Sequence, residues 1–84
     1  MDTFYFRRSI VYQETKNIVK YINNLLKKYP IEENYAICSQ IRRASTSIPI
    51  NIAEGFSRFS AKEKVRFIEI AFGSLTELIC EFEI

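Results

Sequence analysis

The chain contains no histidine and no tryptophan, and it has only two glycines, two prolines and two cysteines among its 84 residues. Without histidine it lacks the commonest general base. Gly55 and Gly73 are too far apart to form a glycine-rich phosphate loop. So few glycines and prolines leave little room for hairpins or long loops. These absences argue against an enzyme and favour an all-helical fold.

The two cysteines, Cys38 and Cys80, are too few for a disulfide framework, and no histidine is present to complete a zinc site. Both fall on predicted apolar helix faces, where a free cysteine acts as a small hydrophobe. No stretch approaches the roughly 20 apolar residues that span a bilayer. Residues 1–9 carry their basic pair after the aromatics, unlike a signal peptide. We therefore expect a soluble cytoplasmic protein with no metal and no cofactor.

The apolar content is high for so short a chain. The sequence is 48% hydrophobic and includes seven phenylalanines and five tyrosines. A domain of this length buries only about 60–65% of the surface of its unfolded chain. Three helices cannot easily hide this much apolar surface from water. We therefore expect one helical domain, residues 1–84, that also buries surface against another chain.

The charges are divided unevenly along the sequence. Up to Arg66 there are twelve cations and six anions, and after it there are four anions and no cation. A helix across this boundary is basic at one end and acidic at the other. Such asymmetry can steer a polyanion or favour charge-matched self-association. The alternative is a solvated surface with uneven charge and no partner.

The first helix is predicted over residues 8–29. Its apolar residues step by four and three, as in a coiled-coil seam. Pro30 would then stop the helix, because a residue that precedes proline resists the α region. The seam consists of Val11, Thr15, Ile18, Ile22, Leu25 and Tyr29, with Val19 and Leu26 beside it.

The second helix is predicted over residues 32–56, with a kink at Pro49. Proline has no N–H to donate and its ring crowds the carbonyl of Ser45, yet the apolar pattern continues past it. Gly55 is a candidate for a left-handed cap near the helix end. The pattern across the proline is Ile41, Ala44, Ile48 and Ile52.

Polar side chains around Pro49 have predicted structural roles. The hydroxyls of Ser45, Thr46 and Ser47 are placed to bond backbone carbonyls near the bend. Asn51 is expected to satisfy backbone that the proline frees. If the helix persists, Glu54 and Arg58 form an i,i+4 ion pair.

The third helix is predicted over residues 61–84. Ser60 and Glu63 form a capping box at its start. Two apolar or small stripes run along it, so it is either central in a bundle or shared with a neighbouring subunit. The first stripe is Val65, Ile68, Phe72, Leu75, Ile79 and Phe82, and the second is Phe67, Ile70, Ala71, Ser74 and Leu78.

Short motifs spread over nearly the whole chain carry a family resemblance. They are Tyr12-Gln13, Tyr29-Pro30, Glu33-Asn34-Tyr35, Ser39-Gln40-Ile41-Arg42-Arg43-Ala44, Ser47-Ile48-Pro49, Asn51-Ile52-Ala53-Glu54-Gly55, Arg58, Ser60 and Ala71-Phe72-Gly73-Ser74-Leu75-Thr76-Glu77-Leu78. In this combination, the chain resembles the four-helix-bundle family of proteins encoded by intervening sequences inside bacterial large-subunit ribosomal RNA genes. That family includes the accessory variability determinant of diversity-generating retroelements.

The resemblance implies an up-and-down bundle that assembles as a ring, typically a homopentamer. It also implies a basic surface that binds RNA or a nucleic-acid enzyme such as a reverse transcriptase. Family members usually carry a fourth helix after the one that contains Gly73, so we expect three helices here and a chain truncated at its C-terminus relative to the family. The positions with expected structural roles are Pro49, Asn51, Glu54, Gly55 and Gly73.

The candidate RNA contacts are basic residues that flank the second and third helices, and together they would form one phosphate-binding patch. They are Arg42, Arg43, Arg58, Lys62, Lys64 and Arg66. The alternative is that one of the paired arginines is solvated and the other binds a carboxylate such as Glu54. The tyrosines are more typical of core or interface positions than of base stacking.

The sequence thus predicts a non-enzymatic, self-associating helical scaffold that binds RNA or a protein that handles nucleic acid. The alternative is a purely structural oligomer, or a truncated relic, with no nucleic-acid partner. A helix-turn-helix DNA-binding protein is a weaker third reading, because the third helix is too apolar after Arg66 to be a recognition helix.

Overall fold

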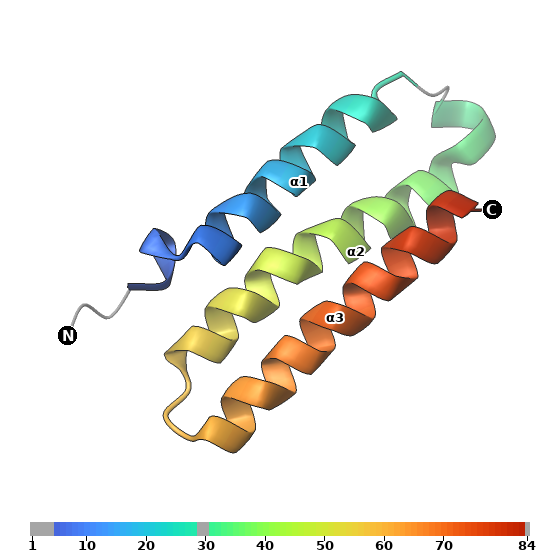
Figure 1. Ribbon diagram of the computed structural model, residues 1–84. Helices are drawn as coiled ribbons and strands as arrows, with labels where there is room; N and C mark the ends of the chain where they lie inside the picture. The colour runs from blue at the N-terminus through green and yellow to red at the C-terminus, as the bar shows by residue number, and fades with distance from the viewer. Residues whose placement is uncertain (1–4, 29–30, 84) are drawn as a thin grey trace.

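The computed structural model of the chain describes residues 5–28 and 31–83, and its regular elements are all helices. A short 3-10 helix, η1 (Tyr5–Arg8), precedes α1 (Ile10–Leu26), which is followed by α2 (Ile31–Ser57) and α3 (Ala61–Glu83). The long helices run up and down in an elongated molecule of 47 × 21 × 15 Å (Figure 1). The predicted all-helical, up-and-down architecture is confirmed.

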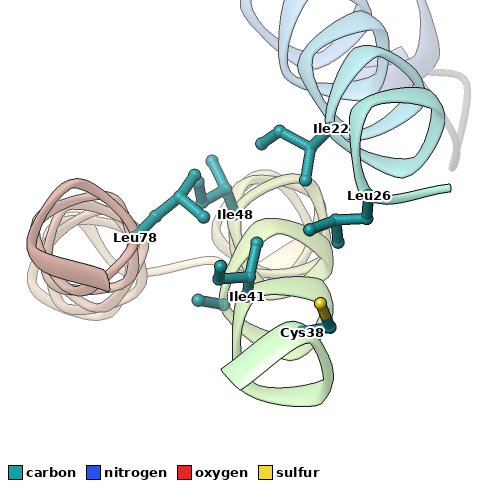
Figure 2. Close-up of a cluster of buried hydrophobic side chains, with 7 residues drawn as sticks. Ile22, Leu26, Cys38, Ile41, Ile48 and Leu78 are labelled. Carbon is teal, nitrogen blue, oxygen red and sulfur yellow. The ribbon is translucent and has the colours of Figure 1, made fainter. Parts of the chain in front are cut away.

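Helix α2 is the middle element and contacts both of the others (Figure 1). In the described part of the chain, no Cα atom of α1 lies within 8 Å of one in α3. Seen along the helix axes, α1 and α3 lie on different sides of α2 (Figure 2). The three helices therefore form an open layer, in which only α2 has long helices on two sides.

The core is a narrow apolar band centred on α2. Ile22 and Leu26 reach it from α1, and Leu78 reaches it from α3 (Figure 2). Each such side chain contributes about 1.5–3 kcal/mol when fully buried. The predicted stripe across Pro49 is confirmed as the core face of α2, because its four members are all buried. They are Ile41, Ala44, Ile48 and Ile52.

Small residues bring α2 and α3 close together. Ser45 is completely buried, and Ala71 of α3 is nearly so. A Cβ atom added to Gly55 would lie 3.3 Å from the Cβ of Phe67 and 3.4 Å from the carbonyl oxygen of Lys64. The predicted left-handed cap at Gly55 is wrong, since neither glycine has a positive φ and α2 continues to Ser57. Gly55 instead allows close approach of α3.

Pro49 lies inside an uninterrupted α2, so the proline does not break the helix. As predicted, nearby hydroxyls bond a backbone carbonyl: Ser45 Oγ donates to Arg42 O at 3.0 Å, and Thr46 Oγ1 donates to the same oxygen. Asn51 Nδ2 donates to Ser47 O at 2.8 Å. Asn51 therefore donates to a carbonyl close to the proline. The carbonyl that lacks its helical donor is that of Ser45, because Pro49 has no N–H, and Asn51 does not bond it. The predicted bend stays a prediction.

Ser47 joins α2 to α3. Its Oγ lies 2.8 Å from Ser74 Oγ and accepts a hydrogen bond from Asn51 Nδ2 at 2.9 Å. This hydroxyl was predicted to bond a carbonyl of its own helix. The structure uses it instead in a polar contact between two helices, where both partners are half-buried.

The helix boundaries differ from the predictions by a few residues. Helix α1 begins at Ile10 because Ser9 caps it, with Ser9 Oγ accepting from Tyr12 N at 3.3 Å. It ends at Leu26, where Lys28 N donates to Leu25 O and tightens the last turn. The roles predicted for Tyr29 and Pro30 lie outside the described residues. At the start of α3, Ser60 Oγ accepts from Glu63 N at 3.1 Å, which is one half of the predicted capping box.

The two stripes of α3 have different environments. Ala71 and Leu78 of the second stripe are buried against α2, whereas all six members of the first stripe are exposed. Both cysteines were predicted to lie on apolar helix faces as small hydrophobes; Cys38 is buried in the core, whereas Cys80 is exposed. The first stripe is therefore an exposed apolar face, and only Ile68 of it borders the hollow that Val11 of α1 shares with Gly55 of α2.

Candidate nucleic-acid interface

The predicted basic residues fall into two separate groups. Arg42 and Arg43 lie in the middle of α2, whereas Arg58 follows its last turn. Sixteen residues of helix separate Arg42 from Arg58, a distance of about 24 Å. The other cations, Lys62, Lys64 and Arg66, are in the first turns of α3. The structure therefore does not join all six residues in one patch.

Two further cations lie at the same end of the molecule as the α2–α3 turn. η1, which carries Arg7 and Arg8, lies at that end because α1 and α2 run in opposite directions (Figure 1). The proximity is also seen in a hollow of about 500 Å³ that Val11 of α1 shares with Phe56 of α2 and Lys64 of α3. We call this region the basic end. It comprises Arg7, Arg8, Arg58, Lys62, Lys64 and Arg66.

Two members of the basic end hold the α2–α3 turn. Arg58 Nη2 lies 3.1 Å from Glu54 Oε2, which is the predicted i,i+4 ion pair, and its guanidinium lies 4.7 Å from the centre of the Phe67 ring. Lys64 Nζ donates to Phe56 O at 3.4 Å, near the end of α2. An ion pair this exposed stabilises the fold by less than about 1 kcal/mol. These two side chains are engaged with the protein and are the poorer candidates for ligand contacts.

Lys62 and Arg66 are the better candidates. Both side chains are exposed, and within the described part of the chain neither side chain makes a hydrogen bond or an ion pair. They stand one helical turn apart on the same side of α3, so their Cβ atoms are about 6 Å apart. Together with Glu63 and Glu69 they border a shallow depression. Two cations at this spacing can contact successive phosphates of an extended strand.

Phe59 is an exposed aromatic residue at the tip of the α2–α3 turn. Its side chain is fully exposed, between Arg58 and the start of α3. A phenylalanine ring that is fully exposed to water gains none of the stabilisation that burial of an apolar side chain provides. Flanked by cations, it has the chemistry of a base-stacking position. The sequence pointed only to tyrosines for this role. Two of them, Tyr21 and Tyr35, are exposed but lie on α1 and near the start of α2.

The middle of α2 is less suitable for phosphate. Arg42 is half-buried, while Arg43 is exposed and borders a depression that also includes Ser74 and Glu77 of α3. The negative charge of Glu77 opposes a phosphate here. Glu63 and Glu69 border the depression of Lys62 and Arg66 in the same way, so the acids do not separate the two regions, and the half-burial of Arg42 does.

Glu81 lies near this region and is buried, with an exposed fraction of 8%. Neither of its carboxylate oxygens has a hydrogen-bond partner in the described part of the chain. Burial raises the pKa of Glu81 above 4.5, and the charge of Glu77 raises it further, while Arg43 lowers it. The ionised form of Glu81 is thus disfavoured in the folded chain.

The described residues contain no cluster of side chains suited to hold a metal ion. In the same residues, none of the helices is long and apolar enough to cross a membrane. Arg7, Arg8 and Phe59 were not predicted as site residues, although the up-and-down order of the helices was a signal for the two arginines. One reversal of direction, between the first and second helices, brings the turn after the second helix back to the start of the first (Figure 1).

Comparison with protein families gives one result. The family model described as 23S rRNA-intervening sequence protein matches residues 7–84. No curated protein and no solved structure matches the chain significantly. The match begins at Arg7 and therefore includes the whole basic end and all three long helices.

Proposed function

The chain belongs to the 23S rRNA-intervening sequence protein family, and on this basis we propose that it is a non-enzymatic protein that binds single-stranded RNA through its basic end. The observation that carries the proposal is the combination of Lys62, Arg66 and the exposed Phe59 around one turn. Cations neutralise the backbone, and an aromatic ring accepts a base of any sequence. Such a partner would place the chain in the cytoplasm.

The preference for single strands follows from Phe59. Bases in a duplex are stacked on one another and do not offer a free face to a protein ring, whereas unpaired bases do. Stacking on one aromatic side chain contributes about 1–3 kcal/mol per base. Phosphate contacts alone would not distinguish a duplex from a single strand in this way.

The proposal also includes self-association. The resemblance implies five copies, and the first stripe of α3 supplies apolar surface that a single chain leaves in water. A reverse transcriptase of a diversity-generating retroelement, which the resemblance also implies, is the alternative partner for the basic end. It becomes the favoured partner if RNA does not bind.

Filter binding of a labelled unpaired RNA over a series of salt concentrations tests the RNA partner. The double variant Lys62→Ala/Arg66→Ala is expected to weaken binding, and to reduce the slope of log affinity against log salt by about 1.4, because each single-strand phosphate contact contributes about 0.7. The control is Lys27→Ala/Lys28→Ala, which removes the same charge at the other end of the molecule. Equal losses in the two variants, or affinity that does not fall with salt, would contradict the proposal.

A purely structural oligomer is the second candidate function. It is favoured by the area of exposed apolar surface on α3, which needs no nucleic acid to explain it. In that case the same assay shows no RNA binding above that of a neutral protein, while the purified chain still self-associates in light scattering.

A further inference from the structure

Most of the positive charge of the described residues lies on η1 and α1. Residues 7–28 contain six cations and one anion, a formal net charge of +5, whereas α3 contains three cations and five anions, a net charge of −2. A helix surface that serves only solubility mixes charges of both signs. The basic end includes only two of the six cations in residues 7–28. The other four are Lys16, Lys20, Lys27 and Lys28.

Three of these lysines form one stripe along α1, which we call the lysine stripe. At 100° per residue, Lys16, Lys20 and Lys27 fall within about 40° of one another around the helix, and all three are exposed. Lys28 lies about 80–120° away from them. Glu14, the one anion in residues 7–28, lies about 120–160° away. The lysine stripe is therefore cationic along its whole length.

The fold itself makes little use of the lysine stripe. In the described part of the chain, the side chains of Lys20 and Lys27 make no hydrogen bond or ion pair. Lys16 Nζ lies 5.4 Å from the centre of the Tyr12 ring, a contact that leaves N–H groups of the ammonium available. Lys16 and Lys20 are one turn apart, so their like charges repel and weaken the helix. A polyanion bound along the stripe would remove this repulsion.

The lysine stripe lies on the same face of the molecule as Lys62 and Arg66. Val11 of α1 and Ile68 of α3 border one hollow, which marks the opposite face of the three-helix layer. The lysine stripe is about 140–180° around α1 from Val11. Lys62 and Arg66 are about 120–160° around α3 from Ile68. Both sets of cations therefore point away from the hollow, and one strand can contact both without crossing the layer.

We propose that an RNA strand bound at the basic end continues along α1, with its phosphates on the lysine stripe. The path begins at η1 and then follows the stripe for about 17 Å, from Lys16 to Lys27. Lys16 and Lys20 have the same one-turn spacing as the pair on α3. Tyr12, the aromatic residue beside the stripe, is half-buried. The stripe therefore contacts the RNA backbone, and base stacking stays at Phe59.

This inference rests on the proposed function and specifies which RNAs it favours. A strand supplies one phosphate per nucleotide, so the lysine stripe requires about three nucleotides beyond those held at the basic end. Each further contact adds about 0.7 to the slope of log affinity against log salt. Long unpaired RNA should therefore bind with a slope steeper by up to about 2.1 than RNA that covers the basic end alone.

Fluorescence anisotropy over a series of salt concentrations tests the path, with labelled oligouridylates of about 4 and about 12 nucleotides. Lys16→Ala/Lys20→Ala is expected to reduce the slope by about 1.4 with the long RNA, and to leave binding of the short RNA unchanged. Both side chains are exposed and alanine favours helix, so the helical circular dichroism signal should be retained.

Lys27 and Lys28 provide a matched control, because they are exposed neighbours of equal charge and only Lys27 lies on the stripe. With the long RNA, Lys27→Ala should reduce the slope by about 0.7, and Lys28→Ala should not change it. The double variant of both then loses half as much slope as Lys62→Ala/Arg66→Ala.

Two results would overturn the inference while the proposed function stands, provided that Lys62→Ala/Arg66→Ala still weakens binding of both RNAs. One is an unchanged slope for Lys16→Ala/Lys20→Ala with the long RNA. The other is an equal effect of Lys27→Ala and Lys28→Ala. If neither RNA binds in a salt-dependent way, the proposed function fails together with the inference.

Discussion

The two glycines offer a matched test of how closely α2 and α3 are packed. Both have negative φ and lie inside helices, where alanine is favoured over glycine by about 0.5–1 kcal/mol. A Cβ atom at Gly73 meets nothing within 4 Å. Gly73→Ala is therefore expected to raise the stability by that full amount. In a domain of this length, it would raise Tm by about 2–8 °C.

Gly55→Ala should have the opposite sign. The new Cβ would lie 3.3 Å from Phe67 Cβ and 3.4 Å from Lys64 O, and both atoms are fixed to the backbone of α3. The helices must separate by a few tenths of an ångström, and overpacking of this kind costs about 1–3 kcal/mol. After the gain in helix propensity, the net loss is up to about 2.5 kcal/mol.

Thermal unfolding followed by circular dichroism measures both variants. All samples should have the same protein concentration, because self-association makes Tm depend on concentration. Unfolding in urea gives the free energies directly. If Gly55→Ala stabilises the chain as much as Gly73→Ala does, α2 and α3 are not closely packed at Gly55, and lack of space for a Cβ atom does not explain the glycine at this position.

Three further outcomes are expected. Because the pKa of Glu81 is raised in the folded chain, the folded state holds this proton more tightly, and the free energy of unfolding falls as pH rises from about 4.5 through the raised pKa. Glu81→Gln should remove this fall and be more stable than wild type at pH 7, which urea unfolding at a series of pH values measures. Phe59→Ala should weaken binding of unpaired RNA about tenfold, with little change for duplex RNA or for Tm. Ser60→Ala should lower stability by about 1 kcal/mol in urea unfolding, because the N–H of Glu63 loses its acceptor at the start of α3.

The local signals in the sequence were sufficient for the order of the helices, and for their extent to within a few residues. A serine before an apolar run marked the start of α3, and the apolar spacing across Pro49 showed that α2 would continue through the proline. The same signals also explain the largest local error. Glycine near a helix end is typical of a left-handed cap, but at Gly55 the reason for glycine is the close approach of α3, which leaves little room for a Cβ atom.

Sequence periodicity could not show which stripe of α3 faces α2. The first stripe carries the larger side chains and the more regular spacing, so hydrophobicity alone favours it as the core face. The structure instead packs the second stripe against α2 and buries Ala71 and Leu78 of it, because Ala71 and the Ser74–Ser47 contact let the two backbones approach closely. Size at the contact, and not apolar content, decides which face packs when one helix has two candidate faces.

The candidate site shows a similar limit. The sequence identified the basic residues but not the distances between them. At a rise of 1.5 Å per residue, Arg42 is about 24 Å from Arg58 at the end of α2, and so it is also far from Lys62 at the start of α3. Phe59 had no periodic pattern, because it belongs to a turn and is recognised only by its exposure. Helical periodicity cannot identify a single exposed residue in a turn.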